Sequence, residues 1–238
     1  MEAVIFDLDG VVTRTAEVHA EAWKRLFDEY LAARGRRLGE RFEPFDRRSD
    51  YLRFVDGKPR YEGVASFLAS RGIELPLGSP DDLDERETVC GLGNRKNRYF
   101  QETLERTGAA PYPTTIELIA RLRKRGVRTA IVSSSRNCVA VLEAAAIREL
   151  FDVKVDGLDA AELGLAGKPD PALFLEAARL LDVEPADAAV VEDAISGVEA
   201  GRRGHFGLVI GLDRAGQHEA LVAAGADLVV ADLGEVAA

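Results

Sequence analysis

Short apolar runs, each ended by small or acidic residues, recur along the chain and constrain its fold more than any other feature. The clearest runs cover residues 3–6, 129–132, 188–191, 207–211 and 227–230, and a weaker one covers 151–155. Between them lie patterns typical of helices, such as the amphipathic stretch 116–126 and the alanine- and leucine-rich stretch 138–147. Strands that alternate with helices over residues 109–238 predict a parallel sheet covered on both faces. The run at 3–6 is too short to be stable alone, so we expect it to join that sheet.

The segment 14–108 has a different pattern, with helical stretches at 16–35 and 62–72 and no convincing strand. Two polar stretches, 39–63 and 77–88, contain more charged residues than a compact core buries, so they are predicted to be loops or part of a second face. The sequence therefore predicts an α/β fold, a Rossmann-like parallel sheet core with an inserted α-helical cap domain. The expected boundaries are 1–13 and 109–238 for the core and 14–108 for the cap.

Composition excludes several classes of function. The 238 residues include 41 acidic and 31 basic side chains, a formal net charge of -10. Binding to nucleic acid or to an anionic membrane requires a positive electrostatic field on the protein, so neither is expected as a partner. The two cysteines form neither a metal-binding pattern nor a disulfide framework, and no apolar run is long enough to span a membrane. The chain starts without a signal-peptide core, so we expect a cytoplasmic protein. For the oligomeric state, a monomer is favoured.

Polar residues stand where the predicted strands end, and one lysine precedes the helix expected to begin with Asp170 as N-cap and Pro171 as its first residue. Ligands of open α/β sheets bind beyond the carboxyl ends of the strands, so these side chains are expected to meet at one edge. They are Asp7, Asp9, Ser133, Ser134, Ser135, Lys168, Glu192 and Asp193.

This set of side chains suits phosphoryl transfer. Four clustered carboxylates repel one another unless a cation joins them, and oxygen ligands with open positions suit Mg²⁺. Lysine and serine bind phosphoryl oxygens, and an ionised aspartate can accept the phosphoryl group. In an extended strand Asp7 and Asp9 point the same way, and only one can lie in line with phosphorus. The other must at times carry a proton, and its neighbour raises its pKa accordingly, but the sequence alone does not assign the roles.

Each motif by itself also fits a structural reading. "DLDG" fits a strand end with an Asx-type turn, "SSSRN" a helix N-cap, "GKP" an ordinary turn, and "VVEDA" acids in the first turn of a helix. Their joint occurrence at successive strand ends favours one functional site.

Taken in order, "FDLDGVV", "VSSSRN", "GKPDP" and "VVEDAISGVEAG" resemble the four motifs of the haloacid dehalogenase-like phosphotransferase superfamily. Residues 9–23, "GLGNRKN" (91–97) and the G-x-x-R motif at 57–60 are similar to its β-phosphoglucomutase branch in particular. The resemblance covers the whole predicted core and implies a helical cap inserted after the first strand.

For the core, the resemblance implies that Asp7 is the phosphorylated nucleophile and that Asp9 is the general acid and base. The implied Mg²⁺ ligands are Asp7, the backbone carbonyl of Asp9, Glu192 and Asp193. The implied phosphate-binding residues are Ser133 and Lys168, with Ser134 and Asn137 beside them.

For the cap, the resemblance implies a second phosphate site and a sugar site. Arg60 is the expected distal phosphate ligand, and a planar guanidinium suits a phosphate because it can bind through two donors. The other implied substrate-binding residues are His19, Trp23, Gly57, Lys58, Lys96 and Asn97. A solvated loop or basic helix face remains the alternative for Lys58 and Lys96, and packing in the cap core is the alternative for Trp23. The loop 36–63 is longer than in the best-known mutases and resembles a longer-capped subgroup described as mutase-like hydrolases.

The implied activity is Mg²⁺-dependent interconversion of β-glucose 1-phosphate and glucose 6-phosphate through an aspartyl-phosphate and a bound bisphosphate. The substrate class is therefore a small-molecule sugar phosphate. A sugar-phosphate phosphatase with the same core chemistry is the alternative. A non-catalytic binding protein is a third hypothesis, and the complete set of core motifs argues against it.

Overall fold

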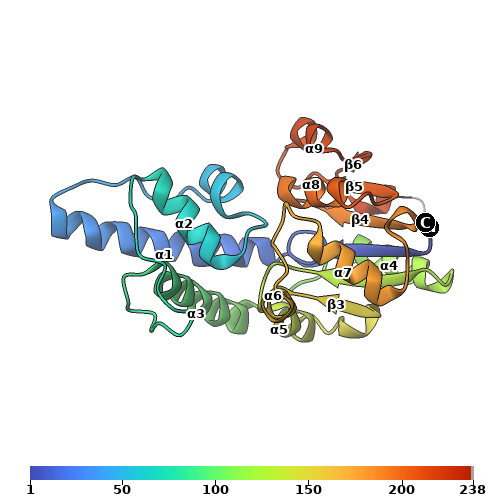
Figure 1. Ribbon diagram of the computed structural model, residues 1–238, viewed down its shortest axis with the longest axis horizontal. Helices are drawn as coiled ribbons and strands as arrows, with labels where there is room; N and C mark the ends of the chain where they lie inside the picture. The colour runs from blue at the N-terminus through green and yellow to red at the C-terminus, as the bar shows by residue number, and fades with distance from the viewer. Residues whose placement is uncertain (237–238) are drawn as a thin grey trace. The chain divides into compact units, whose positions relative to one another are not determined.

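The computed structural model describes residues 1–236, which form two compact units (Figure 1). One unit combines Met1–Thr15 with Ala109–Ala238 and is called the core unit below. The other, Ala16–Gly108, is called the helical unit. In the part of the chain that the structure describes, none of the helices has both the length and the apolar character needed to cross a membrane.

The core unit contains one parallel sheet of six strands, which confirms the predicted α/β class. The strands are β1 (Ala3–Asp7), β2 (Arg128–Val132), β3 (Val153–Val155), β4 (Ala188–Glu192), β5 (Leu208–Leu212) and β6 (Leu228–Val230). Their order in the sheet is β3-β2-β1-β4-β5-β6, and every neighbouring pair is parallel. The chain order reverses at β1, which lies between β2 and β4. Ligands of doubly wound sheets bind at this switch point, so the fold directs attention to the carboxyl end of β1.

Helices cover the sheet because its central strands are apolar on both faces. The helices of the core unit are α4 (Pro113–Lys124), α5 (Cys138–Ala144), α6 (Gly157–Leu163), α7 (Ala172–Leu181), α8 (Ile195–Arg203) and α9 (His218–Ala224). Single 3₁₀ turns lie at Arg148–Leu150, Pro185–Asp187 and Leu233–Glu235. Ala3 and Ile5 belong to one buried cluster with residues of α7, α8 and α9, and Figure 1 shows α7 in front of the strands. The residues of β1 that alternate with them point to the opposite face.

Several helix boundaries differ by a few residues from the sequence prediction, and two of them have a clear local cause. The helix α7 begins at Ala172 rather than at Pro171, although Pro171 already has helical dihedral angles and Asp170 accepts a hydrogen bond from the Ala172 N–H at 2.9 Å. The helix α5 ends at Ala144 rather than at 147, because Ala146 adopts a φ of 53° that a right-handed helix cannot continue through.

The helical unit is built around aromatic side chains. It comprises α1 (Thr15–Leu38, whose first residue belongs to the core unit), the π-helical turn η1 (Tyr51–Val55), α2 (Arg60–Ser70) and α3 (Val89–Thr107). The ring of Phe27 lies 4.0 Å from that of Phe67 and 5.3 Å from that of Phe45, centroid to centroid. All three side chains are fully buried, so this cluster is the core that a chain without strands needs here.

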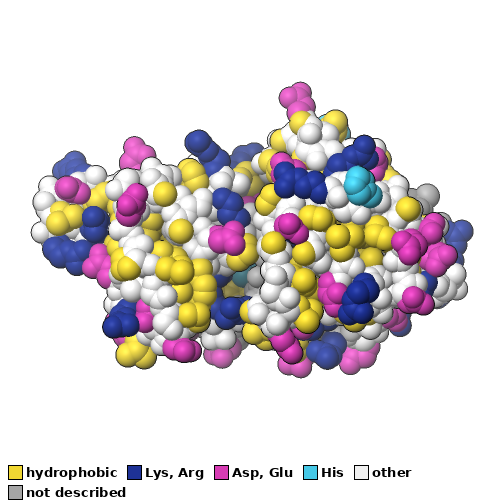
Figure 2. Space-filling model, in the orientation of Figure 1, with side chains coloured by type: hydrophobic (Ala, Val, Ile, Leu, Met, Phe, Trp, Pro, Cys, Tyr) yellow, Lys and Arg dark blue, Asp and Glu magenta, His cyan; other side chains and the backbone are white. Residues whose placement is uncertain are grey.

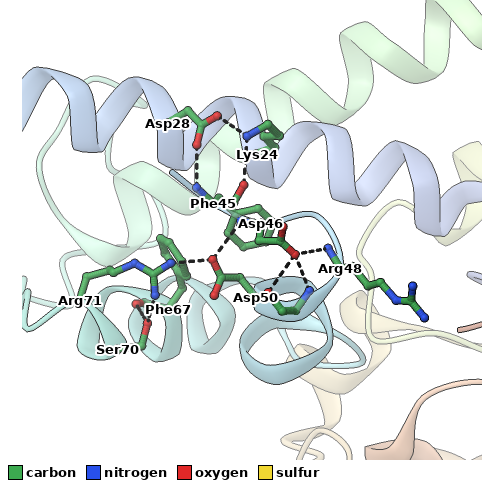
Figure 3. A network of polar contacts seen from close by, with 10 residues as sticks. Lys24, Asp28, Phe45, Asp46, Arg48, Asp50, Phe67, Ser70 and Arg71 are labelled. Carbon is green, nitrogen blue, oxygen red and sulfur yellow. Dashed lines mark hydrogen bonds and ion pairs between the residues drawn. The ribbon is translucent and has the colours of Figure 1, made fainter. Parts of the chain in front are cut away.

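The polar stretch 39–63 is more ordered than the sequence suggested. It contains η1 and the start of α2, and the ring of Phe45 packs against the rings of both Phe27 and Phe67. Figure 3 shows the polar contacts that fix its backbone. Lys24 Nζ donates to the Phe45 carbonyl at 3.0 Å, and Asp28 accepts from the Phe45 N–H at 2.8 Å. The segment is therefore tied to α1 rather than being a free loop.

A second set of contacts ties the same segment to α2. Asp50 accepts hydrogen bonds from the Asp46 N–H at 2.9 Å and from Arg71 Nη2 at 2.6 Å (Figure 3). Asp46 in turn accepts from the N–H groups of Arg48 and Ser49 at 3.0 and 2.6 Å. Residues 40–46 have no regular secondary structure, as the prediction of loops implied. The anchoring of the stretch 39–63 was not predicted, because its apolar residues, such as Phe45 and Val55, stand among charged residues without a periodic pattern.

Replacing Phe45 with alanine should therefore destabilise the helical unit by about 3–5 kcal/mol, the usual cost of emptying a buried aromatic site. Urea unfolding followed by tryptophan fluorescence measures this, because Trp23 stacks on Phe27 at 5.3 Å in the same cluster. Phe42→Ala, at a partly exposed position of the same segment, is the control and should cost clearly less. Equal effects of the two substitutions would show that Phe45 does not anchor the segment.

Candidate active site

Three carboxylates converge at the carboxyl end of the sheet, as the strand-end pattern predicts. Asp7 is the last residue of β1, Glu192 is the last residue of β4, and Asp193 follows it directly. One oxygen from each carboxylate can be chosen so that all three lie within 4.8 Å of one another. Parallel pairing of β1 with β4 places these strand ends side by side, so the topology itself brings the acids together.

Lys168 provides the buried positive charge of this cluster. Its side chain is 1% exposed, and its Nζ donates to Asp7 Oδ1 and to Glu192 Oε1. Burial alone lowers the pKa of Lys168, but the charges of Asp7 and Glu192 outweigh this and raise it. Lys168 therefore stays protonated and keeps its charge at the strand ends.

The surroundings of Asp7, in contrast, favour the neutral form of its carboxyl group. Burial raises its pKa well above the usual value, the neighbouring Glu192 and Asp9 raise it further, and Lys168 opposes them. A single lysine thus does not balance the acids around Asp7. A further cation beside these groups would favour the ionised form of Asp7.

The residues fit a hard divalent cation. Three converging carboxylates with one lysine leave excess negative charge, and oxygen ligands are those that Mg²⁺ prefers. Both oxygens of Glu192 already accept hydrogen bonds, Oε1 from Lys168 and Oε2 from the Ala194 N–H at 2.9 Å. Glu192 therefore helps to orient Lys168 within this cluster, together with Asp7.

Asp9 has surroundings unlike those of Asp7. It is partly exposed, and its carboxylate accepts hydrogen bonds from hydroxyl groups, namely Thr15 Oγ1 at Oδ1 and Ser133 Oγ at Oδ2, the latter at 3.2 Å. The Thr15 hydroxyl also lies 2.7 Å from Thr13 Oγ1. Neither threonine was predicted as a site residue. Their spacing of two in "TRT", shortly after the acid pair, is the pattern that could have indicated them.

Two glycines let the backbone approach these acids. At Gly10, which has a φ of +94°, an added Cβ would lie 1.9 Å from Asp193 Oδ2. At Gly197 in α8 an added Cβ would lie 1.9 Å from Glu192 Oε1. No larger residue fits either position without moving a carboxylate, so both glycines belong to the site although the sequence analysis did not single them out.

The serine-rich loop after β2 forms tight turns beside the acids. Ser133 is buried, its N–H donates to the Val155 carbonyl at 3.1 Å, and its Oγ accepts from the Ser135 N–H at 3.1 Å. Asn137 comes just before α5, and its N–H donates to Ser135 Oγ at 3.1 Å. Ser134 and Asn137 are both partly exposed. Ser133, Lys168 and the three acids are thus brought together, with Ser134 and Asn137 on the adjoining loop.

Within the helical unit, two of the predicted substrate residues contact each other. Lys96 Nζ, on α3, lies 2.5 Å from His19 Nδ1, on α1. The His19 ring stacks on Phe100 with centroids 4.2 Å apart, and Lys96 lies 4.9 Å from the centre of the Trp23 ring. Lys96 is buried rather than part of a solvated basic face, so the surface alternative for this residue does not hold.

The other predicted cap residues are more dispersed. Trp23 is buried in the aromatic core, which favours packing. Gly57 has a φ of 68° in the turn before α2, and Lys58 Nζ donates to Ser66 Oγ at 3.0 Å. Arg60 is partly exposed at the first position of α2, with its guanidinium carbon 5.2 Å from the Tyr61 ring centre. Asn97 is partly exposed on α3.

A Rossmann-like sheet whose switch point carries an acidic cluster with a buried lysine defines a class of phosphoryl-transfer enzymes. The sequence profile of the haloacid dehalogenase-like hydrolases matches residues 1–205. The chain belongs to this family, as the motif resemblance implied, and it is an enzyme of the corresponding type.

Individual relatives point to one branch of the family. The chain is 48% identical to a β-phosphoglucomutase of Mycobacterium bovis over 99% of its own length and 91% of that protein. It is 36% identical to the β-phosphoglucomutase of Bacillus subtilis, over 97% and 89% of the two chains. Among solved structures, CbbY from Rhodobacter sphaeroides in complex with phosphate superposes with a TM-score of 0.73 at 28% identity, covering 99% of this chain and 96% of that one.

Proposed function

We propose that this protein is a β-phosphoglucomutase, which interconverts β-glucose 1-phosphate and glucose 6-phosphate. The observation that carries the proposal is the contrast between the two acids of "DLD". Asp7 is buried against Lys168, whereas Asp9 is partly exposed and held by hydroxyl groups. With a cation bound beside it, Asp7 is suited to act as the nucleophile, and the more open Asp9 is suited to exchange a proton. The full-length similarity to β-phosphoglucomutases supports the choice of substrate.

In the proposed reaction, the aspartyl-phosphate at Asp7 gives its phosphoryl group to the free hydroxyl of the substrate, which forms the bound bisphosphate. Asp7 then attacks the other phosphoryl group, which releases the product and restores the aspartyl-phosphate. Asp9 transfers the proton to and from the sugar oxygen that gains or loses the phosphoryl group. Lys168 and Ser133 hold the transferring phosphoryl oxygens, with Ser134 and Asn137 beside them. The contacts of Lys168 and Ser133 with Asp7 and Asp9, respectively, support these roles.

We further propose Mg²⁺ as the cofactor, held by Asp7, Asp193 and the Asp9 carbonyl, with Glu192 adding charge and orienting Lys168. When bound, Mg²⁺ neutralises charge on the phosphoryl oxygens and on the attacking carboxylate. The convergence of three carboxylates around one lysine supports this assignment.

For the helical unit, we propose that Arg60 binds the phosphate that is not being transferred and that Lys96, Asn97 and His19 contact the sugar. Gly57 and Lys58 shape the turn that precedes Arg60, and Trp23 supports the Lys96 side chain from the aromatic core. The close approach of Lys96 to His19 supports a shared role for this pair.

A sugar-phosphate phosphatase is the second candidate, because the matching family profile is that of hydrolases. The same core chemistry would serve both, and only the second acceptor differs, a sugar hydroxyl in one case and water in the other. We also propose that the protein acts on small molecules in the cytoplasm as a monomer. On the face shown in Figure 2, acidic and basic side chains are interspersed.

A coupled assay tests the proposal. Purified protein, Mg²⁺, β-glucose 1-phosphate and a trace of glucose 1,6-bisphosphate are combined, and glucose 6-phosphate is detected through its dehydrogenase. We expect steady formation of glucose 6-phosphate that stops when the metal is chelated. Absence of glucose 6-phosphate while free phosphate accumulates would favour the phosphatase instead.

Arg60→Ala should separate the two halves of the reaction. Loss of a bidentate phosphate ligand should lower kcat/KM for the mutase reaction by about 100-fold or more, while acetyl phosphate still phosphorylates Asp7 at close to the normal rate. Mass spectrometry of the Asp7 peptide measures the second quantity, and Arg53→Ala, at an exposed position of η1 in the same helical unit, is the control. Equal loss in both assays would show that Arg60 does not recognise the second phosphate.

A further inference from the structure

Arg214 connects several parts of the core unit at the carboxyl end of the sheet. It lies two residues beyond β5, its Nε donates to the Gly10 carbonyl at 3.3 Å, and its Nη1 donates to the Ala231 carbonyl at 3.3 Å. Nη1 also lies 3.6 Å from Asp232 Oδ2, and the side chain is about one-quarter exposed. Its guanidinium group therefore reaches from the ends of β5 and β6 to the turn that follows Asp7 and Asp9.

The same guanidinium packs on Tyr112. Its central carbon lies 3.9 Å from the centre of the Tyr112 ring, and that of Arg14 lies 4.9 Å from the same ring. Both distances are within the range of a cation–π contact. Tyr112 immediately precedes α4, so the two arginines hold an aromatic side chain at the point where the chain has returned from the helical unit.

Backbone hydrogen bonds join residues 110–112, where the chain returns from the helical unit, to residues 12–14, where the chain leaves the core unit. The Tyr112 N–H donates to the Val12 carbonyl and the Arg14 N–H to the Ala110 carbonyl, each at 2.9 Å. Thr13 forms an isolated antiparallel bridge with Pro111. The segment from Gly10 to Thr15, which supplies the hydroxyl partners of Asp9, is thus fastened to residues 110–112.

We propose that Arg214 is a positioning residue for phosphoryl transfer: through the Gly10 carbonyl and the Tyr112 ring it fixes the turn that carries Asp9 and its threonine partners. The backbone at Gly10 has little room to move, because it already lies close to the Asp193 carboxylate. A shift of this peptide would move Asp9, Thr13 and Thr15 relative to Asp7. Displacements of about 1 Å in a reacting geometry commonly cost about 100-fold in rate.

The proposal rests on the proposed function only for its sugar-phosphate assay. Phosphoryl transfer by the core can be measured separately as Mg²⁺-dependent hydrolysis of acetyl phosphate, which needs no sugar site but needs Asp9 as the base for the water that attacks the aspartyl-phosphate. Failure of the mutase assay in the unaltered protein would therefore count against the proposed function, while the acetyl phosphate assay would still test Arg214.

Arg214→Met keeps the length of the side chain but removes its donors and charge. We expect kcat for both substrates to fall by about 10- to 100-fold, with KM changed by less than about threefold, because no predicted substrate ligand is removed. Arg214→Lys keeps the charge without the planar fork and should recover only part of the rate. Tyr112→Leu should lower kcat in the same direction, and Tyr112→Phe, which keeps the ring face, should lower it less.

Arg123→Met is the matched control. Arg123 also clamps carbonyl and carboxylate oxygens within the core unit, at Leu150 O (2.9 Å) and Asp152 Oδ1 (3.2 Å), but it does not contact the turn after Asp9. It should lower the unfolding midpoint without changing kcat. An Arg214→Met protein that is destabilised like Arg123→Met but retains normal kcat would overturn the proposal, as would full recovery of kcat in Arg214→Lys.

Discussion

The Asp7→Asn protein is expected to lose phosphoryl transfer almost completely, with kcat reduced by about 10⁴-fold or more. An amide cannot accept the phosphoryl group as a carboxylate does, and the substitution also removes one of the two anions that hold Lys168. Release of glucose 6-phosphate and of free phosphate should both disappear, because either second acceptor needs the aspartyl-phosphate. Circular dichroism before the assay checks that the variant is folded.

Asp9→Asn tests the role of the second acid separately from that of Asp7. If Asp9 only moves protons, acetyl phosphate should still phosphorylate Asp7, because acetate leaves without protonation, whereas transfer from or to a sugar oxygen should be lost. Phosphorylation of the Asp7 peptide is followed by mass spectrometry. Turnover of Asp7→Asn within tenfold of the unaltered protein, or failure of acetyl phosphate to phosphorylate Asp7 in the Asp9→Asn protein, would contradict the assigned roles.

Lys168→Met is expected to cause the second large effect, on stability as well as on activity. The buried Asp7 and Glu192 carboxylates would lose the cation that both contact, and leaving a buried charge without its partner costs about 3–5 kcal/mol. Urea unfolding in the absence of Mg²⁺ measures this loss. The exposed Lys124→Met in α4 is the control and should change the free energy of unfolding by less than about 0.5 kcal/mol.

The activity of the Lys168→Met protein tests the role of Lys168 independently of its stability. Without the lysine, phosphoryl oxygens lose a positive partner in the transition state, so kcat should fall by about 100-fold or more. A Lys168→Met protein with unchanged stability would mean that the ion pairs of Lys168 with Asp7 and Glu192 contribute little to folding. Unchanged kcat would remove Lys168 from the proposed phosphate site.

The core of the fold could be predicted from the sequence because its strands are short, apolar and separated by helical periodicity. Ala3–Asp7 and Ala188–Glu192 stand out for this reason, and parallel topology then forces their carboxyl ends together. The convergence of Asp7, Glu192 and Asp193 follows from those two facts alone. Arg214 lies three residues beyond the run at 207–211, so the same strand-end rule places it at this edge of the sheet, but its contacts with Gly10 and Tyr112 leave no pattern in the sequence.

The remaining features depend on three-dimensional contacts that leave no pattern in the sequence. The different surroundings of Asp7 and Asp9 arise from Lys168 and Thr15, one distant in sequence and the other six residues away. The anchoring of segment 39–63 depends on Phe45 reaching an aromatic cluster formed by α1 and α2. Neither periodicity nor composition encodes such pairings, so the long charged segment was predicted to be a loop or part of a second face.

The fate of the phosphoryl group tests the central claim most directly. Phosphorus NMR can follow β-glucose 1-phosphate with Mg²⁺, a trace of glucose 1,6-bisphosphate and the purified protein, resolving glucose 6-phosphate from inorganic phosphate in one time course. We predict that nearly all of the lost substrate signal reappears as glucose 6-phosphate while inorganic phosphate stays close to the enzyme-free control. Inorganic phosphate that rises in step with the loss of substrate would contradict the mutase assignment and identify water as the acceptor.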